Sequence, residues 1–580
     1  MSFTWKDYTQ ELKAVVKGWW PTTLVKRLAH RSFYRPSFDE VMVEKRSEGT
    51  AEMKRTLTGL DLLMFGVGII LGAGVFVITA QVAKDNAGPA TIVSYAIAGL
   101  SALLSSFCYA EYAVDYPIAG GAFTFISLTY GELCGWITVA NLILEYVLAN
   151  AAVARSFSGY FANLIGKDSG FFAVTPNDSL NLDFWAFGLV LAATALLCYS
   201  TRESSTFNLV VTIIHLAVVL FIIIAGLTKA KASNMQPFLL DSGPRGIFDG
   251  AALVFFSYIG FDAVATTAEE CKEPSKALPI GIVGSLIVVT TFYILASLTL
   301  TLMVPVDAID ASAGFSAAFT YVGLDWAKYI VALGALLGIV TGVLVGALGV
   351  ARLLTTVGRE HMLPSFFAYV HPTLGTPLVS TLFLGIVTAI IALFTAFGDL
   401  VNLVSICTLF VFWSVANGTL SRRYIAPRHR LWPIFHQVWI LISVIGFTVS
   451  YQLGASYPGT LVEWLPMCVF LISWFCATLS MHIICRQQYT PSGFAVPLMP
   501  WLPSVSIILN TFLLGTIPAT AWIQFAIFVA VMVGFYALYS VHAATHADDL
   551  RAARTDLPTK TVAGKEPGSA GSVEMTKPVN

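Results

Sequence analysis

Charge is scarce in this sequence. Asp, Glu, Lys and Arg make up 12% of its 580 residues, about half the share of an ordinary soluble domain. Hydrophobic residues make up 56%, and the mean hydropathy is +0.75. A chain with this balance cannot be kept in solution, so the lipid bilayer is its expected partner. The net charge of −1 offers no field that would attract nucleic acid, and no nucleic-acid partner is predicted.

Paired cysteines and enzyme motifs are also missing. The cysteines lie mostly inside apolar runs without metal-ligand spacing, which indicates reduced packing residues and predicts neither a metal site nor a cofactor. There is no HExxH, no GxSxG and no Walker glycine loop, so an enzyme is not expected. A cleavable signal peptide is not evident, because residues 1–13 are polar and amphipathic. The cysteines are Cys108, Cys134, Cys198, Cys271, Cys407, Cys468, Cys476 and Cys485.

Long apolar runs recur along almost the whole chain. A bilayer core requires about 20 apolar residues in helical form, because unpaired backbone groups are too costly in hydrocarbon. We therefore predict an all-α integral membrane protein with about fourteen transmembrane helices. The segments are 61–83, 89–113, 122–160, 184–201, 208–228, 247–268, 278–303, 327–357, 378–397, 401–420, 435–453, 460–484, 499–516 and 520–543.

Lys and Arg fall on alternate connections between these segments. Basic connections stay on the cytoplasmic side of a membrane, and an even number of spans places both termini there. The opposite connections are acidic or nearly neutral, apart from Lys229, Lys231 and Arg245. The basic positions that share one side are Lys26, Arg27, Arg31, Lys45, Arg46, Lys54, Arg55, Arg202, Lys272, Lys276, Arg352, Arg359, Arg422, Arg423, Arg428, Arg430 and Arg486.

Two apolar segments contain features that break helices. The first carries Gly66, Gly68, Gly72 and Gly74 within about ten residues, a density that weakens a helix. Close packing against a neighbouring helix is one explanation. The other is a break at mid-membrane, with amides near Gly72, Ala73 and Gly74 facing an anion and carbonyls near Ile70 facing a cation.

The sixth segment repeats this feature, because Gly260 and the acid Asp262 interrupt an apolar run. One interrupted helix early in each half predicts an inverted five-helix repeat of the kind found in secondary transporters. An amino acid, with its carboxylate and ammonium groups, is the type of substrate that such paired backbone groups bind.

Five long fragments occur in an order and at a spacing that resemble the cationic amino acid transporter family, in particular its plant branch, of the amino acid, polyamine and organocation superfamily. They are GAGVF at 72–76, CYAEYAVDYPIAGGAF at 108–123, GELCGWITVANLILEYVLANAAVARSFSGY at 131–160, FFSYIGFDAVATTAEECKEPSKALPIGI at 255–282 and GALGVARLLTTVGREHMLPSFFAYVHPTLGTP at 346–377.

The resemblance implies a LeuT-like fold of two inverted five-helix repeats with additional C-terminal helices. We accordingly expect a cytoplasmic segment at 1–60, a ten-helix transport core at 61–420, four further transmembrane helices at 421–544 and a disordered cytoplasmic tail at 545–580.

The resemblance also implies a set of substrate-binding residues. Ile70 and Ile259 would offer carbonyls to the substrate ammonium, Ala73 and Gly74 would offer amides to its carboxylate, and Phe256 would cover the bound substrate as a gate. Asn150 would join the site. Ile339 would shape the side-chain pocket, where its bulk limits the length of the substrate side chain.

Isolated ionisable residues inside apolar runs are further candidates. A charge at the centre of a span costs about 3 kcal/mol or more on insertion scales, so Glu145 is expected to face the central cavity. It would favour cationic substrates or share a coupling proton, or it would merely lock helices. His215 would carry the coupling proton and brace the fifth span against the first, since imidazole titrates near neutral pH; a core histidine without this role is the alternative.

Two acids near the ends of spans have less definite roles. Asp262 is counted among the substrate-binding residues, and it would accept hydrogen bonds from the unwound sixth helix or help to gate the cytoplasmic path. Glu111, toward the cytoplasmic end of the second span, is either an acid solvated at the interface or a residue involved in conformational change, as the resemblance implies.

The prediction for function is a secondary active transporter that imports amino acids, in particular cationic ones such as arginine, lysine or ornithine, with protons, by alternating access. Neutral amino acids such as glutamine, polyamines, or a role as an amino acid sensor are the alternatives. The plasma membrane is the predicted location, with the vacuolar or another internal membrane as the alternative.

Overall fold

The computed structural model describes residues 5–19, 21–35, 55, 57–72, 74–117, 120–167, 171–177, 180–199, 205–311, 313–371, 376–426, 430–454, 461–491 and 493–555. Regular structure within these ranges is helical except for one antiparallel hairpin, formed by β1 (Ala173–Asn177) and β2 (Leu180–Asp183). The all-α class predicted from the sequence is confirmed.

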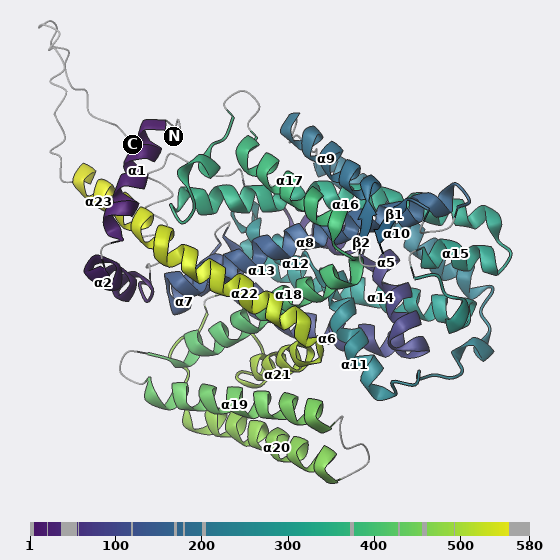
Figure 1. The fold of residues 1–580 in the computed structure, drawn as a ribbon. Helices are drawn as coiled ribbons and strands as arrows, with labels where there is room; N and C mark the ends of the chain where they lie inside the picture. Colours follow the sequence, from purple (N-terminus) through teal and green to yellow (C-terminus); the bar gives the residue numbers. More distant parts are fainter. Residues whose placement is uncertain are drawn as a thin grey trace, which may run out of the picture.

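The helices run from an N-terminal pair to a long C-terminal helix (Figure 1). The α-helices are α1 (Trp5–Gly18), α2 (Pro21–Arg31), α4 (Gly59–Ile70), α5 (Gly74–Asp85), α6 (Thr91–Asp115), α7 (Gly121–Tyr130), α8 (Glu132–Leu164), α9 (Phe184–Tyr199), α10 (Ser205–Leu227), α11 (Pro244–Val254), α12 (Phe261–Thr266), α13 (Pro274–Pro279), α14 (Ser285–Met303), α15 (Gly314–Tyr321), α16 (Asp325–Arg359), α17 (Leu378–Phe394), α18 (Phe397–Tyr424), α19 (Leu431–Gly454), α20 (Leu461–Ile484), α21 (Trp501–Thr516), α22 (Ala519–Phe535) and α23 (Val541–Thr555). Short 3₁₀ or π turns are η1 (Gly88–Ala90), η2 (Ala232–Met235), η3 (Phe255–Tyr258), η4 (Ala268–Glu270), η5 (Ile280–Gly284), η6 (Val306–Ala308), η7 (Ser365–Ala368) and η8 (Tyr536–Ser540).

Ten helical runs in the described ranges are long and apolar enough to cross a membrane, and the bent pair of α4 and α5 makes an eleventh. Three more apolar helices, α9, α17 and α21, have only 16, 17 and 16 residues. At about 1.5 Å per residue they are shorter than a typical hydrocarbon core. Each coincides with a predicted segment, but the total of about fourteen spans stays a prediction.

One predicted segment is divided in the structure. Residues 122–160 were expected as a single run, yet α7 ends at Tyr130 and α8 begins at Glu132. Gly131 between them has φ +106, a conformation that side chains disfavour, and a Cβ there would lie 2.8 Å from the Ser32 carbonyl oxygen. The glycine therefore both turns the chain and admits the N-terminal segment.

The long helices α8, α16 and α18 lie together in the middle of the molecule, with α8 packed against both of the others (Figure 1). The pair α19 and α20 lies along one side and joins the rest through α18 and α21. Small residues allow this close packing. A Cβ on Gly338 or Gly346 of α16 would lie 2.2 Å from His215 or 2.4 Å from Asn150, so the glycines admit these side chains.

The C-terminal end departs from the prediction. Disorder was expected from residue 545, but α23 continues to Thr555. The helix continues because Asp548 of α23 has a partner that the sequence pattern did not reveal. Arg31 of α2 pairs with Asp548 at 2.6 Å and with Glu132 of α8 at 2.9 Å. Burial lowers the pKa of the Arg31 guanidinium, but these two carboxylates raise it, and the pKa stands above its usual value. The remainder of the predicted tail, 556–580, lies outside the described residues.

Candidate functional site

The first apolar segment is broken where its glycines predicted. Helix α4 ends at Ile70, α5 begins at Gly74, and the two helices are bent by 45°. A Cβ on Gly72 would meet only the Ile69 carbonyl oxygen, at 3.4 Å, so this position is open. Ala73 lies outside the described residues. The interruption leaves the negative end of α4 facing the positive end of α5.

The other two glycines of this run are packed against neighbours. A Cβ on Gly66 would lie 2.7 Å from the Ser285 hydroxyl, and one on Gly68 would lie 2.2 Å from the Thr212 hydroxyl. Both explanations considered for the glycine run therefore hold, close packing in the body of α4 and a break at its end.

The sixth predicted segment is interrupted as well. Helix α11 gives way to the 3₁₀ turn η3 after Val254, Ile259 is extended with ψ 139, and α12 starts at Phe261. Gly260 between them has φ +115, and a Cβ there would lie 2.2 Å from the Ile69 side chain. Both the dihedral angle and the close approach require glycine at this position.

The two breaks touch. A Cβ on Gly74 would lie 2.8 Å from the Ser257 Cα, so the start of α5 rests directly on the backbone of η3. The Tyr293 hydroxyl of α14 lies 2.5 Å from the Ile70 carbonyl oxygen and 2.9 Å from that of Ser257. One side chain thus spans the carbonyls exposed at both breaks.

Tyr293 was not predicted as a site residue. It belongs to a buried group of three tyrosines, in which the Tyr258 hydroxyl donates to the Tyr95 carbonyl at 2.9 Å and the Tyr293 ring lies 5.4 Å from both other rings. A polar aromatic residue inside the apolar segment 278–303 was the available signal. Its importance could not be read without knowing that α14 passes both breaks.

Glu145 and Asp262, predicted separately, lie in one buried polar group. Glu145 on α8 is 1% exposed, and its Oε2 has no hydrogen-bond partner among the described residues. The next residue, Tyr146, lies 3.3 Å through its hydroxyl from both carboxyl oxygens of Asp262. The hydroxyl of Tyr109 on α6, buried near both acids, also lacks a partner in the described part of the chain.

No ion pair to Glu145 or Asp262 is found among the described residues. Two buried acids without a cation, and two hydroxyls beside them, make a group able to accept a cation or protons. Within the described ranges no set of three or more His, Cys, Asp and Glu residues could hold a metal ion.

Phe256, predicted as a gate, lies in η3 and is 5% exposed. Its ring contacts that of Phe397, the first residue of α18, edge to face with 6.4 Å between centroids. The ring pair joins the second break to the start of α18. Phe397 was not predicted.

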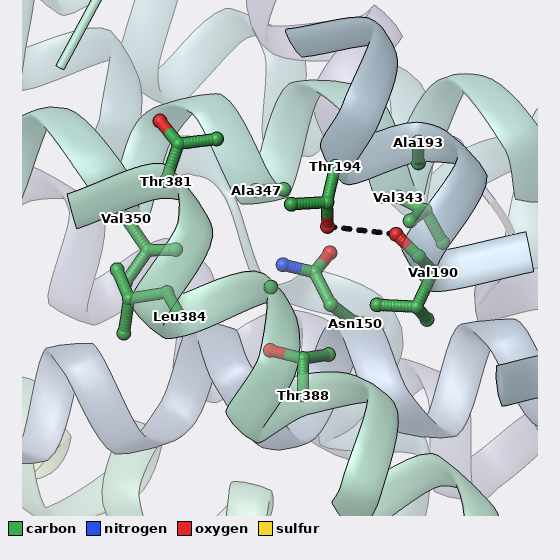
Figure 2. Close-up of a pocket in the computed structure, with 11 residues that line it drawn as sticks. Asn150, Val190, Ala193, Thr194, Val343, Ala347, Val350, Thr381, Leu384 and Thr388 are labelled. Atoms are coloured by element: carbon green, nitrogen blue, oxygen red, sulfur yellow. Dashed lines mark hydrogen bonds between the residues drawn. The ribbon is translucent and has the colours of Figure 1, made fainter. Parts of the chain in front are cut away.

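Asn150 lies at a cavity that is separate from the two breaks. Asn150 lines a small cavity between α8, α9, α16 and α17, with Thr194 among its neighbours (Figure 2). The cavity has room for about one water molecule, and no residue of α4, α5, α11 or α12 lines it. Ile339 of α16 is fully buried.

His215 lies in apolar surroundings. Its ring donates to the Gly334 carbonyl, packs on Gly338 and contacts Phe76 of α5 with 6.3 Å between ring centroids. It therefore contacts both the first span, as the bracing hypothesis requires, and α16. The Nε2 atom has no hydrogen-bond partner among the described residues.

Glu111 is not solvated at an interface, and that alternative is wrong. It is 1% exposed, accepts from Nε and Nη2 of Arg423 at 2.9 and 2.7 Å, and also accepts from the Val496 amide at 2.8 Å. The acid thus ties α6 to the end of α18 and to the connection between α20 and α21. The sequence did not reveal Arg423 as its partner, since 312 residues separate them.

Comparison with known proteins identifies the family. The family model described as amino acid permease matches residues 57–477, and the model for the C-terminus of that permease matches residues 494–544. The matched ranges contain both breaks, the acid pair and the Glu111 ion pair.

Curated relatives cover most of the chain. It is 43% identical over 531 residues to cationic amino acid transporter 7, chloroplastic, of Arabidopsis thaliana, covering 88% of this chain and 90% of the relative. It is 39% identical over 526 residues to the vacuolar cationic amino acid transporter 8 of the same plant, covering 89% and 88%. The methylthioribose transporter of Bacillus subtilis (strain 168) is 35% identical over 446 residues, covering 76% and 95%. The chain therefore belongs to the amino acid permeases, in the cationic amino acid transporter family, whose members are multi-pass membrane transporters and not enzymes.

Proposed function

We propose that this protein carries cationic amino acids together with protons by alternating access, and that it binds the substrate at the two touching breaks. The observation that carries the proposal is the contact of Gly74 with the Ser257 backbone, which joins the start of one half-helix to the unwound part of another. Backbone groups freed at mid-membrane can replace the water around a zwitterion.

Each end of the substrate has a suitable group. The amides of Gly72 to Gly74 at the start of α5 favour the carboxylate, because the helix dipole is positive there. The carbonyls of Ile70 and Ile259 favour the ammonium. Phe256 against Phe397 would close the site on the outer side.

The preference for cations rests on Glu145 and Asp262. Burying a carboxylate without a partner costs several kcal/mol, roughly 3 or more at the centre of a span. A substrate cation or a bound proton relieves this cost, and no other cation is paired with these acids in the described part of the chain. Ile339 sets how long a side chain can fit.

Proton coupling is assigned to His215, with Glu145 as a second carrier. A proton taken up at the free Nε2 of His215 would place a charge between Phe76 and Gly338. Such a charge is unfavourable there without compensation, so it would be linked to movement of α10 and α16 relative to α5.

The proposed fold contains two inverted five-helix repeats and fourteen spans, with α9, α17 and α21 completing the count and both termini cytoplasmic. The proposed location is the plasma membrane. The relatives' names give chloroplastic and vacuolar locations. Imaging of the full chain with a fluorescent tag would distinguish the plasma membrane from these two locations.

The experiment that tests the proposal is uptake in reconstituted vesicles. Labelled arginine should enter, an inward proton gradient should accelerate it, and unlabelled lysine should compete better than glutamine, a polyamine or methylthioribose. Stronger competition by glutamine or a polyamine than by lysine would show that cationic amino acids are not the preferred substrates. Binding of arginine without any flux would favour the sensor, and competition by methylthioribose alone would remove amino acids as substrates.

A further inference from the structure

The N-terminal helix α1 has two different faces. Glu11 and Val15 are buried against η8 and α23, and the Tyr539 hydroxyl of η8 donates to Glu11. On the outward side, Leu12, Val16 and Trp19 are 36%, 57% and 50% exposed. These three follow helical spacing, so they form one apolar stripe along the helix.

The exposed charges that residues 8–35 carry near this stripe are all positive. Lys13 and Lys17 on α1 and Lys26 on α2 are all exposed. Among residues 8–35 the only acid is Glu11, and it is buried. Apolar residues flanked by lysines, on the outer side of a helix, are typical of segments that lie in the surface of a membrane.

The position of Trp19 fixes the depth of the stripe. Its indole donates to the Leu538 carbonyl at 2.7 Å. The 20 residues from Ala519 to Leu538 span about 30 Å at 1.5 Å per residue, which is the thickness of a hydrocarbon core. Ile523, Ile527 and Leu538 along this run are 61%, 60% and 53% exposed, as lipid-facing side chains are. Trp19 therefore lies at the boundary between hydrocarbon and headgroups, where tryptophan is enriched.

The helix pair is held in place at this boundary. Arg31 of α2 lies between Glu132, the first residue of α8, and Asp548 of α23, and α1 lies crosswise to α23 (Figure 1). The stripe and its lysines therefore form a fixed surface.

We propose that this surface, formed by Leu12, Val16, Trp19, Lys13, Lys17 and Lys26 and here called the N-terminal basic face, binds anionic lipid headgroups. The leaflet is the one on the side of α1 and α23, which the distribution of Lys and Arg predicts to be cytoplasmic and which is the anionic leaflet of cells. The apolar stripe enters the headgroup boundary, and the lysines bind the phosphate and carboxylate groups beside it.

Lipid is the occupant that the geometry favours over an acidic protein. The stripe lies at the level of Leu538, where the membrane itself is the nearest surface. A soluble partner would have to enter the headgroup layer to reach Trp19. Val25 and Phe33 of the same N-terminal segment, 65% and 77% exposed, extend the apolar contact.

The test is hydrogen–deuterium exchange of the full-length protein in nanodiscs of phosphatidylcholine alone and in nanodiscs that also contain phosphatidylserine. Backbone amides of residues 8–35 should exchange roughly tenfold more slowly in the anionic discs. High salt should remove much of this difference. Glycerophosphoserine added to phosphatidylcholine discs should not reproduce it.

Two variants separate lipid binding from folding. The triple variant Lys13→Gln, Lys17→Gln and Lys26→Gln should lose the difference, and the control variant Lys229→Gln, an exposed lysine just after α10, should keep it. Val16→Ser should reduce it. In every variant, hydrogen–deuterium exchange in α8 and α16 must stay as in the wild type, because this shows that the fold is intact. Equal exchange in both kinds of disc, a difference that survives the triple variant, or protection that appears only with an added acidic protein would overturn the proposal.

Discussion

The Tyr293 hydroxyl lies 2.5 Å from the Ile70 carbonyl oxygen, the acceptor that the family resemblance assigned to the substrate ammonium. Its single proton also faces the Ser257 carbonyl at 2.9 Å. In this structure a tyrosine therefore occupies the place that the resemblance assigns to the ammonium. It satisfies the carbonyls at the breaks, which would otherwise be buried without a partner at a cost of about 1–3 kcal/mol each.

Tyr293→Phe should destabilise the empty protein and tighten substrate binding. The empty site loses the donor to both carbonyls, whereas the loaded site has the substrate ammonium in its place. We expect a melting temperature lower by a few degrees without substrate, from a loss of roughly 1–2 kcal/mol, and a several-fold lower Kd for arginine. Thermal unfolding with and without arginine measures both. The control is Tyr258→Phe, which removes the donor to the Tyr95 carbonyl instead. It should destabilise the protein without lowering the Kd for arginine. A similar gain in affinity in both variants would show that the Tyr293 hydroxyl does not compete with the substrate.

Gly74→Ala should abolish transport. The added methyl would lie 2.8 Å from the Ser257 Cα, a backbone atom that cannot rotate away, so the two breaks must separate. The matched variant is Gly72→Ala, whose Cβ would meet only the Ile69 carbonyl oxygen at 3.4 Å. Uptake in vesicles should fall at least tenfold for Gly74→Ala and much less for Gly72→Ala, with both proteins monodisperse on gel filtration. Equal activity of the two variants would show that the contact between the two breaks is not needed for transport.

Glu145→Gln should change which substrate is preferred. The amide keeps the size of the side chain and removes the charge, so arginine uptake should fall by about tenfold or more while glutamine uptake is retained. Competition between labelled arginine and unlabelled glutamine gives the ratio directly. An equal loss for both amino acids would assign Glu145 to helix packing or to proton coupling.

Glu111→Gln should destabilise the protein, because it breaks the ion pair with Arg423. Arg423 would be left buried without a carboxylate, and breaking a buried pair in this way costs about 3–5 kcal/mol. The melting temperature should fall accordingly. The control is Glu273→Gln. Glu273 and its partner Lys276 are 68% and 77% exposed, so breaking this pair should leave the melting temperature unchanged. If Glu111→Gln melted like the wild type, the pair would contribute nothing to holding α18 against α6.

His215→Asn should remove the acceleration of uptake by acid. Asparagine retains a donor for the Gly334 carbonyl but cannot take up a proton. The control is His436→Asn, since His436 is equally buried but bonds to Ser480 in α20, in the helix pair at the side of the molecule. Uptake of arginine at acidic and neutral outside pH compares the variants. Unchanged pH dependence in His215→Asn would make this residue a packing histidine and leave Glu145 as the proton carrier.

Local features of the sequence predicted the breaks correctly. Glycine at Gly72, Gly74 and Gly260 weakens a helix wherever it occurs in the fold, and hydrophobic length alone marked most of the spans. The same pattern could not show that Gly66 and Gly68 face side chains, that Gly74 rests on the Ser257 backbone and that Gly72 is open, because these differences depend on what the fold places against each glycine.

What the sequence determined by itself is therefore the membrane class, the glycine-loosened stretches and the isolated acids, since each follows from residue type and near neighbours along the chain. Only the tertiary structure decided the pairings. It placed Tyr293 across both breaks, Tyr146 on Asp262, Arg423 on Glu111 and Asp548 on Arg31. The physical reason is distance along the chain: these partners are brought together by helix packing across many residues, and no local pattern of hydrophobicity or charge specifies which buried polar group meets which.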